Sequence, residues 1–223
     1  MKFYRSGDEL DMQIFTICPK SFASNTYLLA SKHSAIIIDP SVSVDAIEEK
    51  LKELNVELKG ILLTHGHFDH IISIDTIRAK HSVPVYIHKE DDCMLTDGNL
   101  NGFYLFFQKD CVHSPADVLF EDGYEIQLDD ETITVLHTPG HSKGSCCFIF
   151  NDDTNGTSLI TGDTLFSNSV GRCDLFGGNE KELATSIKKL FTFDKKSPIY
   201  PGHNESSTLG EALDNVAYFF DIL

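Results

Sequence analysis

Short apolar runs alternate with segments of helical periodicity along the first half of the chain. Runs rich in β-branched and other apolar residues predict strands, and apolar side chains spaced three or four residues apart predict helices. In one such helix Ile47, Leu51 and Leu54 share a face, and Ser43 or Asp45 can cap the first turn. The predicted elements are strands at residues 26–29, 35–39, 60–64 and 83–88 and helices at residues 44–54 and 71–80.

The second half of the chain has more strands than helices. The apolar pattern on both sides of Asp129 and Asp130 predicts a β-hairpin over residues 125–138. Many strands with helices between some of them are typical of layered sheets covered by helices, so we predict an α/β fold. The remaining predicted elements are strands at residues 145–150, 157–161 and 197–200 and helices at residues 180–190 and 209–220.

Length and composition favour one domain with a sizeable core. The chain has 223 residues, of which 41% are hydrophobic, and it contains no linker, repeat or low-complexity segment. We therefore predict a single domain over residues 1–223. No apolar run is long enough to span a bilayer, and residues 1–9 turn acidic where a secretory signal would be apolar. These features predict a soluble, cytoplasmic protein.

The charge balance narrows the range of partners. A formal net charge of -16, from 34 acidic against 18 basic side chains, repels nucleic-acid backbones and anionic membrane surfaces. We therefore expect a small-molecule substrate and neither nucleic acid nor a membrane, and the pattern leaves the oligomeric state open. Reduced, mostly buried thiols are expected for the scattered cysteines, which are Cys18, Cys93, Cys111, Cys146, Cys147 and Cys173.

Residues 64–70, Thr-His-Gly-His-Phe-Asp-His, carry the most specific chemistry. They follow an apolar run and place three imidazoles and one carboxylate in a short loop. His65 and His67 alternate and so point the same way in an extended loop, whereas Asp69 and His70 stand at the start of a predicted helix. Imidazole nitrogen and carboxylate oxygen are ligands that zinc and similar ions accept. Because one ion cannot easily use all four groups, the segment predicts a paired-metal site and metal-assisted hydrolysis.

Three later segments share this design of an apolar strand, a small-residue turn and one metal-binding side chain. Strand ends in layered α/β sheets meet along one edge, where sites usually form. The aromatic-rich residues 99–114 are interpreted as a loop or short helix over that site. The three segments end at His141, Asp163 and His203, so the expected cluster is His65, His67, Asp69, His70, His141, Asp163 and His203.

The ordered motifs resemble those of the metallo-β-lactamase superfamily. His-x-His-x-Asp-His, Thr-Pro-Gly-His, Gly-Asp and Pro-Gly-His occur in the family's order and cover most of the chain. The resemblance implies a four-layer αββα sandwich with the metal site at one edge of the sheets. It also implies that the first metal is held by His65, His67 and His141, the second by Asp69, His70 and His203, and that Asp163 bridges both.

Within the superfamily, the chain is most similar to glyoxalase II and its short bacterial relatives. Residues 162–166, Gly-Asp-Thr-Leu-Phe, and residues 171–175, Gly-Arg-Cys-Asp-Leu, resemble segments of that group. The resemblance implies a thioester hydrolase with two divalent ions, zinc in the first place and iron or manganese as alternatives. Two cations lower the pKa of a water from about 16 toward about 7, and Asp69, as the catalytic residue, hydrogen-bonds that water and later carries a proton.

Other functions fit parts of the same pattern. Persulfide dioxygenases also keep the Gly-Arg-x-Asp segment but use one iron and molecular oxygen, and a lactonase is a further alternative. A non-catalytic metal-binding or electron-transfer module is the alternative from another class. The complete ligand set and the intact Asp69 favour catalysis over such a module.

The chain departs from the glyoxalase II pattern at several places. Ile72 and Ser73 stand where that group has Gly-Gly, and Asn204 replaces a common glycine after His203. Only about 20 residues, the length of one long helix, follow His203. The helical domain that helps full-length glyoxalase II bind glutathione is therefore not expected, and neither is glutathione specificity.

Arg172 and Lys143 are the candidate substrate-binding residues. Either cation can meet an anionic group of a substrate. The alternative for Arg172, to which we give more weight, is a salt bridge with Asp174 or a neighbouring acid, and the alternative for Lys143 is a solvated loop position. The histidines that are not expected to bind metal are His33, His81, His88, His113 and His137.

Overall fold

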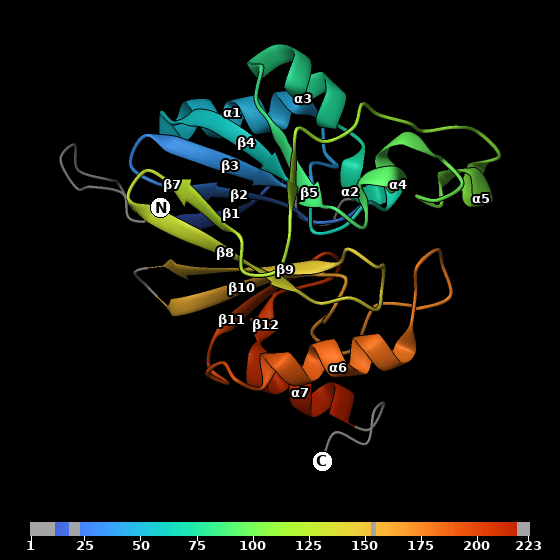
Figure 1. Ribbon diagram of the computed structural model, residues 1–223. Coiled ribbons are helices and arrows are strands. Elements are labelled where there is room, and N and C mark those ends of the chain that lie inside the picture. The colour runs from blue at the N-terminus through green and yellow to red at the C-terminus, as the bar shows by residue number, and fades with distance from the viewer. Residues whose placement is uncertain (1–11, 18–22, 153–154, 218–223) are drawn as a thin grey trace.

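The computed structural model describes residues 12–17, 23–152 and 155–217. Its strands form two six-stranded sheets that pack face to face, and helices cover both outer faces (Figure 1). The predicted αββα sandwich is therefore confirmed. The first sheet comes from the N-terminal half of the chain and the second from the C-terminal half.

The first sheet has the strand order β1-β2-β3-β4-β5-β6. Its first three strands pair antiparallel, and the pairs from β3 to β6 are parallel. Parallel pairing requires crossover segments, which here contain the helices. The elements are β1 (Gln13–Ile17), β2 (Thr26–Ala30), β3 (Ser34–Ile38), α1 (Val44–Leu54), β4 (Glu57–Leu62), α2 (Phe68–Ile71), α3 (Ile74–His81), β5 (Val85–His88), α4 (Asp92–Thr96), α5 (Phe103–Phe107) and β6 (Val118–Phe120).

The second sheet has the strand order β12-β11-β10-β9-β8-β7. All of its pairs are antiparallel except β10 with β11, which α6 separates along the chain. Two helices, α6 and α7, cover its outer face (Figure 1). The elements are β7 (Glu125–Leu128), β8 (Glu131–His137), β9 (Cys146–Asp152), β10 (Gly156–Gly162), α6 (Glu180–Leu190), β11 (Pro198–Pro201), β12 (Ser207–Thr208) and α7 (Leu209–Val216).

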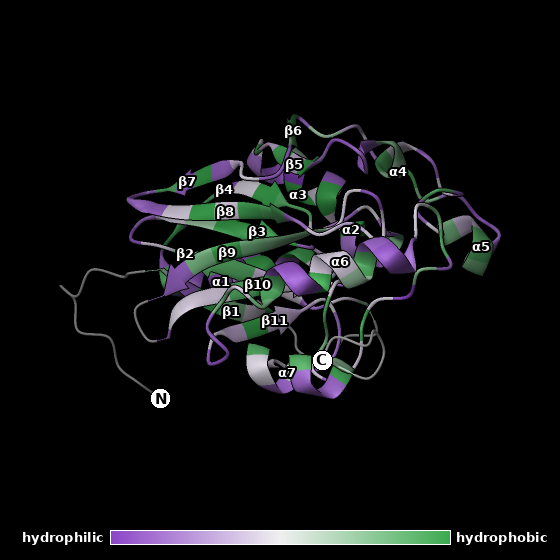
Figure 2. Ribbon diagram, turned by 60° about the horizontal axis from the view of Figure 1, so that its bottom comes forward, coloured by the Kyte–Doolittle hydropathy of each residue, from purple (hydrophilic) through white to green (hydrophobic). Residues whose placement is uncertain are grey.

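Central strands are apolar at consecutive positions because both of their faces are buried. In β3, Ile36 and Ile38 pack between the two sheets, whereas Ala35 and Ile37 pack under the helices of the first outer layer. This follows from the period of two along a strand, with one core on each side of the sheet. Figure 2 shows the strands predominantly in the hydrophobic colour, whereas α6 carries both hydrophilic and hydrophobic stretches.

Several predicted elements have the predicted bounds. The helices at residues 44–54 and 180–190 are confirmed as α1 and α6, and the hairpin at residues 125–138 as β7 and β8. The Ser43 side chain caps α1 by accepting a hydrogen bond from the backbone N–H of Ala46. These segments have strong periodicity or a clear cap, so local sequence determines them.

The single helix predicted over residues 71–80 is wrong. The chain forms α2 and α3 instead, with a break at Ile72 and Ser73. The backbone N–H of Ser73 donates to the carbonyl of Pro40 at 2.9 Å, and its hydroxyl donates to the carbonyl of Val42 at 2.6 Å. These bonds to the segment before α1 stabilise the break. The part of the chain that carries Asp69 and His70 is therefore a separate short helix.

Four elements, β1, α4, β6 and β12, were not predicted. Each has five residues or fewer, too few for a periodic pattern. The strand predicted at residues 60–64 is β4, which spans Glu57–Leu62. The prediction missed its first three residues because exposed and buried side chains alternate there, so they form no continuous apolar run. The predictions for residues 1–9, Cys18 and the end of the last helix beyond residue 217 lie outside the described residues.

The described cysteines are all free thiols. Cys146 and Cys147 are buried on opposite faces of β9, as the alternation predicts. Cys93 is exposed, and Cys111 and Cys173 are partly buried, so the expected burial holds for only part of the set. Within residues 12–17, 23–152 and 155–217, no helix combines the length and the hydrophobicity that crossing a bilayer requires.

We expect Phe148→Ala to destabilise the protein by about 3–5 kcal/mol. Phe148 is fully buried between the two sheets, in edge contact with Phe120, so its loss leaves a cavity in the layer that joins them. Urea denaturation measures the change. Phe191→Ala, at a ring that is 44% exposed, is the matched control and should change stability by less than about 1 kcal/mol. Equal effects of the two substitutions would contradict this assignment of the core.

Candidate metal centre

Loops that follow β4, β8, β10 and β11 meet at one edge of the sandwich and bring all seven predicted ligands into one cluster. The cluster contains three overlapping sets of donor atoms, and within each set the atoms lie within 4.8 Å of one another. Asp69 and His203 are partly exposed, and the other five are buried. The first set is His65, His67 and His141, the second is Asp69, His70 and His203, and a third set of His65, His70 and Asp163 overlaps both.

Asp163 lies between the two sets. Its Oδ1 is 3.4 Å from His70 Nε2. Its Oδ2 is 3.5 Å from His141 Nε2 and 3.6 Å from His203 Nε2. One carboxylate therefore reaches histidines of both sets, which is the arrangement expected of a bridging ligand.

Two imidazoles of the first set direct unprotonated nitrogens toward each other. His141 Nδ1 lies 2.7 Å from the carbonyl oxygen of Arg172, so Nδ1 carries the hydrogen. His65 Nδ1 lies 3.0 Å from Thr64 Oγ1, whose own hydrogen goes to a carboxylate, so this Nδ1 also donates. The two Nε2 atoms, 3.2 Å apart, are left with lone pairs. His67 Nδ1 also lies 2.8 Å from His141 Nε2, so three ring nitrogens of the set converge on one point, as they would around a coordinated cation.

Asp39 orients His70 in the same way. Its Oδ2 is 2.9 Å from His70 Nδ1, and its carboxylate also accepts hydrogen bonds from the N–H and the hydroxyl of Thr64. Nδ1 of His70 is therefore the donor, and Nε2 faces the cluster. Asp39 was not predicted as a site residue. Its position directly after an apolar strand, the same design as Asp163, was the available signal.

Several buried ligand atoms have no hydrogen-bond partner, and this observation shows that the cluster fits metal ions. Among the described residues, His67 Nε2, His70 Nε2 and Asp163 Oδ1 are buried and make no hydrogen bond. Leaving a buried polar atom unpaired costs about 1–3 kcal/mol, so the neighbouring pair of His70 Nε2 and Asp163 Oδ1, 3.4 Å apart, requires an explanation. Cations coordinated by the cluster would satisfy His70 Nε2 and Asp163 Oδ1, and nitrogen with carboxylate oxygen suits zinc, iron or manganese.

The two acids of the cluster are ionised. Burial of Asp69 favours the protonated acid, but His70 and His203 outweigh it and lower the pKa of Asp69 to about 2. The pKa of Asp163 is likewise lowered, because His70, His141 and His203 outweigh its burial. Both carboxylates are therefore available as anionic ligands at neutral pH.

The imidazoles divide into two kinds. Burial, with the neighbouring imidazoles, lowers the pKa of His65 well below its usual value, and burial with His141 lowers the pKa of His67 to about 3. Burial also opposes a charge on His70, but Asp163 and Asp39 outweigh it and raise the pKa of His70 well above its usual value. His70 therefore attracts positive charge, whereas His65 and His67 present neutral ligands.

The sequence of this chain matches a known protein family. The model of the metallo-beta-lactamase superfamily matches residues 20–203, a range that contains all seven ligands. This chain belongs to the metallo-β-lactamase superfamily.

Relatives in the superfamily extend over most of the chain. The probable metallo-hydrolase YqgX of Bacillus subtilis is 37% identical over 194 residues, which are 86% of this chain and 90% of that protein. The crystal structure of the BLEG-1 B3 metallo-beta-lactamase has a TM-score of 0.83 and 33% identity, over 91% of this chain and 97% of that one. TTHA1623 in a di-iron-bound form has a TM-score of 0.73 and 30% identity, over 88% and 96%. The chain is thus a metallo-hydrolase of this superfamily.

A second buried acid, Asp91, holds the ligand loops of this metallo-hydrolase together. It accepts hydrogen bonds from the N–H of Gly66 at 3.2 Å, the N–H of Gly144 at 2.7 Å and the hydroxyl of Ser142 at 2.6 Å. Burial raises the pKa of Asp91 although these donors oppose the shift. It thereby links the loop of His65 and His67 to the loop of His141. Sequence analysis did not identify Asp91, because the groups that it binds lie about 25 and 50 residues away in the chain.

Two glycines allow the backbone to pass close to the ligands. A β-carbon at Gly202 would overlap Asp163 Oδ1 and lie 2.8 Å from the ring of His70. A β-carbon at Gly171 would overlap the backbone of Asp163 and lie 2.9 Å from His141 Nδ1. The Pro-Gly-His and Gly-Arg-x-Asp segments therefore need glycine for space rather than for an unusual φ.

The cluster opens into a cleft of about 410 Å³. Arg172 lines this cleft, as predicted for a substrate-binding residue, but its guanidinium pairs with Asp174 through two contacts of 2.6 and 2.7 Å. The alternative interpretation of Arg172, a salt bridge, therefore describes the observed side chain. The backbone carbonyl of Arg172 has a separate function, since it orients His141.

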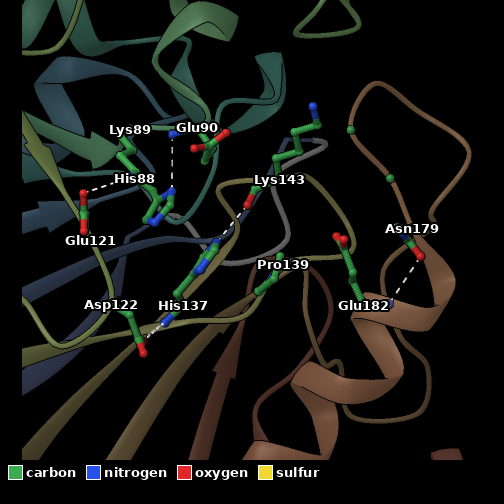
Figure 3. A pocket seen from close by; sticks show the side chains of 12 residues that line it. His88, Lys89, Glu90, Glu121, Asp122, His137, Pro139, Lys143, Asn179 and Glu182 are labelled. Carbon is green, nitrogen blue, oxygen red and sulfur yellow. Dashed lines mark hydrogen bonds and ion pairs between the residues drawn. The ribbon is translucent and has the colours of Figure 1, made fainter.

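Lys143 does not reach this cleft, contrary to the expectation for a substrate-binding residue. It lines a separate cavity with His88, His137, Glu90 and Glu182 (Figure 3). His88 and His137 stack there with ring centroids 3.9 Å apart, and His137 Nε2 donates to the carbonyl of Lys143 at 2.8 Å. The loop of residues 138–144 separates the two cavities, with His141 on one side and Lys143 on the other.

The remaining histidines lie outside the metal cluster, as predicted. His33 is exposed. His81 Nε2 lies 2.5 Å from a carboxylate oxygen of Glu48. His113 pairs with Asp75 at 2.9 Å on the helical side of the first sheet.

We expect Asp39→Asn to weaken metal binding by about 10- to 100-fold without removing a ligand. An amide N–H₂ in place of Oδ2 donates to His70 Nδ1, which moves the imidazole hydrogen to Nε2 and blocks the lone pair. Competition with a chromophoric chelator measures the affinity. Asp214→Asn, at an exposed ion pair with Lys195, is the control and should leave the affinity unchanged. Unchanged affinity in folded Asp39→Asn would contradict this function of Asp39.

We expect Gly202→Ala to lose metal from the second set, because the added methyl group displaces Asp163 or His70. Elemental analysis of the purified variant should show a lower metal content than the wild type. Gly123→Ala is the control, since its β-carbon meets nothing within 4 Å and its cost is limited to a positive φ. Full metal content in Gly202→Ala would show that the loop after β11 can move away from the ligands.

Proposed function

We propose that this metallo-hydrolase cleaves thioesters with two divalent metal ions, held by His65, His67 and His141 and by Asp69, His70 and His203, with Asp163 between them. The observation that carries the proposal is the convergence of both ligand sets on one carboxylate at the floor of an open cleft. Two ions in such a site would supply an activated water and polarise the carbonyl to which that water adds.

The metal ions, when bound, supply a water of lowered pKa and polarise the substrate carbonyl. Asp69 lines the cleft, and a quarter of its side chain is exposed. Since its pKa is about 2, it accepts a hydrogen bond from the attacking water and orients that water toward the substrate. We assign Asp69 this catalytic function in addition to its function as a ligand.

The choice of a thioester follows from the acidity of the leaving group. Both cluster acids that line the cleft, Asp69 and Asp163, have lowered pKa values and are deprotonated at neutral pH. A thiol has a pKa of about 8.5, so its thiolate leaves without a strong proton donor. An alkoxide or an amide anion is far more basic and depends on a general acid. The described cleft therefore favours thioesters over lactones and amides.

We infer zinc as the first candidate for the metal, with iron and manganese as alternatives. Five of the six ligands in the two sets bind through imidazole nitrogen, which suits zinc and iron. The related TTHA1623 occurs in a di-iron-bound form, which supports iron as a real alternative. A persulfide dioxygenase requires one iron, and a complete second set beside Asp163 argues for two ions instead.

We expect Asp69→Ala and Asp163→Ala to lose at least one metal ion and to reduce thioester hydrolysis by at least about 10³-fold. Metal quantification on the purified protein should give two ions per chain for the wild type. A screen of thioesters, including S-lactoylglutathione, measures turnover.

Asp130→Ala, at an exposed surface acid, is the matched control and should keep full metal content and rate. Full turnover and metal content in Asp69→Ala or Asp163→Ala would refute the assignment. One iron per chain with uptake of oxygen from persulfide substrates would favour the dioxygenase.

A further inference from the structure

The short helix α5 exposes an unusual amount of apolar surface. Its sequence is Phe-Tyr-Leu-Phe-Phe, and none of the five side chains is buried. Leu105 is 62% exposed, Phe106 50% and Phe107 47%. A contiguous exposed patch of this kind usually marks a binding site rather than a structural element. In Figure 1, α5 lies beyond α2 and α4 at the same end of the molecule.

An aromatic cluster of Phe68, Phe103, Phe106 and Phe107 connects α5 to the metal centre. The ring of Phe68 lies 5.5 Å from that of Phe103, 5.8 Å from that of Phe106 and 5.6 Å from that of Phe107. Phe68 stands between the ligands His67 and Asp69 in the chain. The position of the cluster relative to the metal centre is therefore determined by the ligand loop itself.

Asn101 holds α5 in this place. Its side chain is fully buried and donates to the carbonyls of Met94 at 3.1 Å and Cys111 at 2.8 Å. Its Oδ1 accepts from the N–H of Phe103, and its backbone carbonyl accepts from the N–H of Phe68. These bonds tie both ends of the α5 segment to α4 and α2. The exposed rings are thus positioned by buried hydrogen bonds rather than lying on a free loop.

Five apolar side chains line the cleft that contains the ligands. Phe68 and Phe106 come from α2 and α5, and Phe166, Val170 and Leu175 come from the segment after β10. Among its described lining residues, the one Lys or Arg is Arg172, which is paired with Asp174. The cleft therefore offers an extended apolar surface and little charge to recognise an anionic group.

We propose that this cleft selects thioesters whose acyl group is apolar, with the acyl chain packed against Phe68 and Phe106 and the carbonyl at the metal centre. The inference rests on the proposed thioester hydrolysis and specifies its substrate class. Burying one methylene group increases binding by about three- to fourfold. A short polar acyl group such as lactoyl reaches little of this surface, so S-lactoylglutathione should be a poor substrate.

The test compares acyl chain lengths on one uncharged thiol. Acetyl, butanoyl, hexanoyl and octanoyl thioesters of N-acetylcysteamine are assayed with the metal-loaded protein. We expect kcat/KM to rise about two- to fourfold for each added methylene until the cleft is filled. The kcat/KM of the hexanoyl thioester should exceed that of S-lactoylglutathione. In Phe106→Ala the ratio of hexanoyl to acetyl kcat/KM should fall at least tenfold. Leu105→Ala, on the same helix but outside the cleft lining, should retain the wild-type ratio.

A binding measurement separates this inference from the proposed reaction. Calorimetry with octanoate and butanoate, the carboxylates that hydrolysis would release, needs no turnover. We expect octanoate to bind the metal-loaded wild type at least tenfold more tightly than butanoate and to lose this advantage in Phe106→Ala. If no thioester is hydrolysed but octanoate keeps this preference, the apolar subsite stands and the reaction is wrong.

Several results would overturn the inference. Thioester hydrolysis with no dependence on acyl length would do so while leaving the proposed reaction intact. A dependence on the length of the thiol alone would assign the apolar wall to the other arm of the substrate. Sedimentation showing a dimer that both Leu105→Ala and Phe106→Ala dissociate would assign the α5 surface to a second copy of the chain.

Discussion

The central constraint on this structure is electrostatic: donor atoms with lone pairs or negative charge converge at one edge of two sheets. His65 and His141 direct lone pairs at each other, and Asp163 carries a buried charge between the two ligand sets. Such an arrangement is unfavourable by itself and becomes favourable when cations are coordinated. The raised pKa of His70 shows the same preference for positive charge, because without a cation the neighbouring carboxylates favour a proton on this imidazole. Much of the surrounding structure orients or supports these few atoms.

The scaffold provides that support through strand ends. β4, β8, β10 and β11 end at the same edge, so short loops suffice to position the ligands. Strands buried on both faces are rigid platforms, because three hydrophobic layers hold them. Two buried acids then link the loops to the scaffold. Asp39 connects β3 to Thr64 and His70, and Asp91 connects the loop of Gly66 to that of Ser142.

Local sequence was sufficient for the elements with strong periodicity and for the ligands. The apolar runs of β2 and β3, the capped helix α1 and the hairpin of β7 and β8 follow from spacing and turn residues alone. The ligands follow because His141, Asp163 and His203 stand in turns after apolar strands and the other four form one dense segment, residues 65–70. What could not be predicted depends on distant contacts. The break at Ser73 comes from bonds to Pro40 and Val42, and the function of Asp91 comes from loops about 25 and 50 residues away in sequence. Lys143 lies on the far side of the His141 loop for the same reason: sequence proximity to a ligand does not determine which cavity a side chain enters.

Anomalous X-ray diffraction from crystals of the metal-loaded protein tests the central claim most directly. The account predicts two ions about 3.5–4 Å apart, one within the set of His65, His67 and His141 and one within the set of Asp69, His70 and His203. Asp163 should contact both. A single fully occupied position, or ions bound away from Asp163, would contradict it.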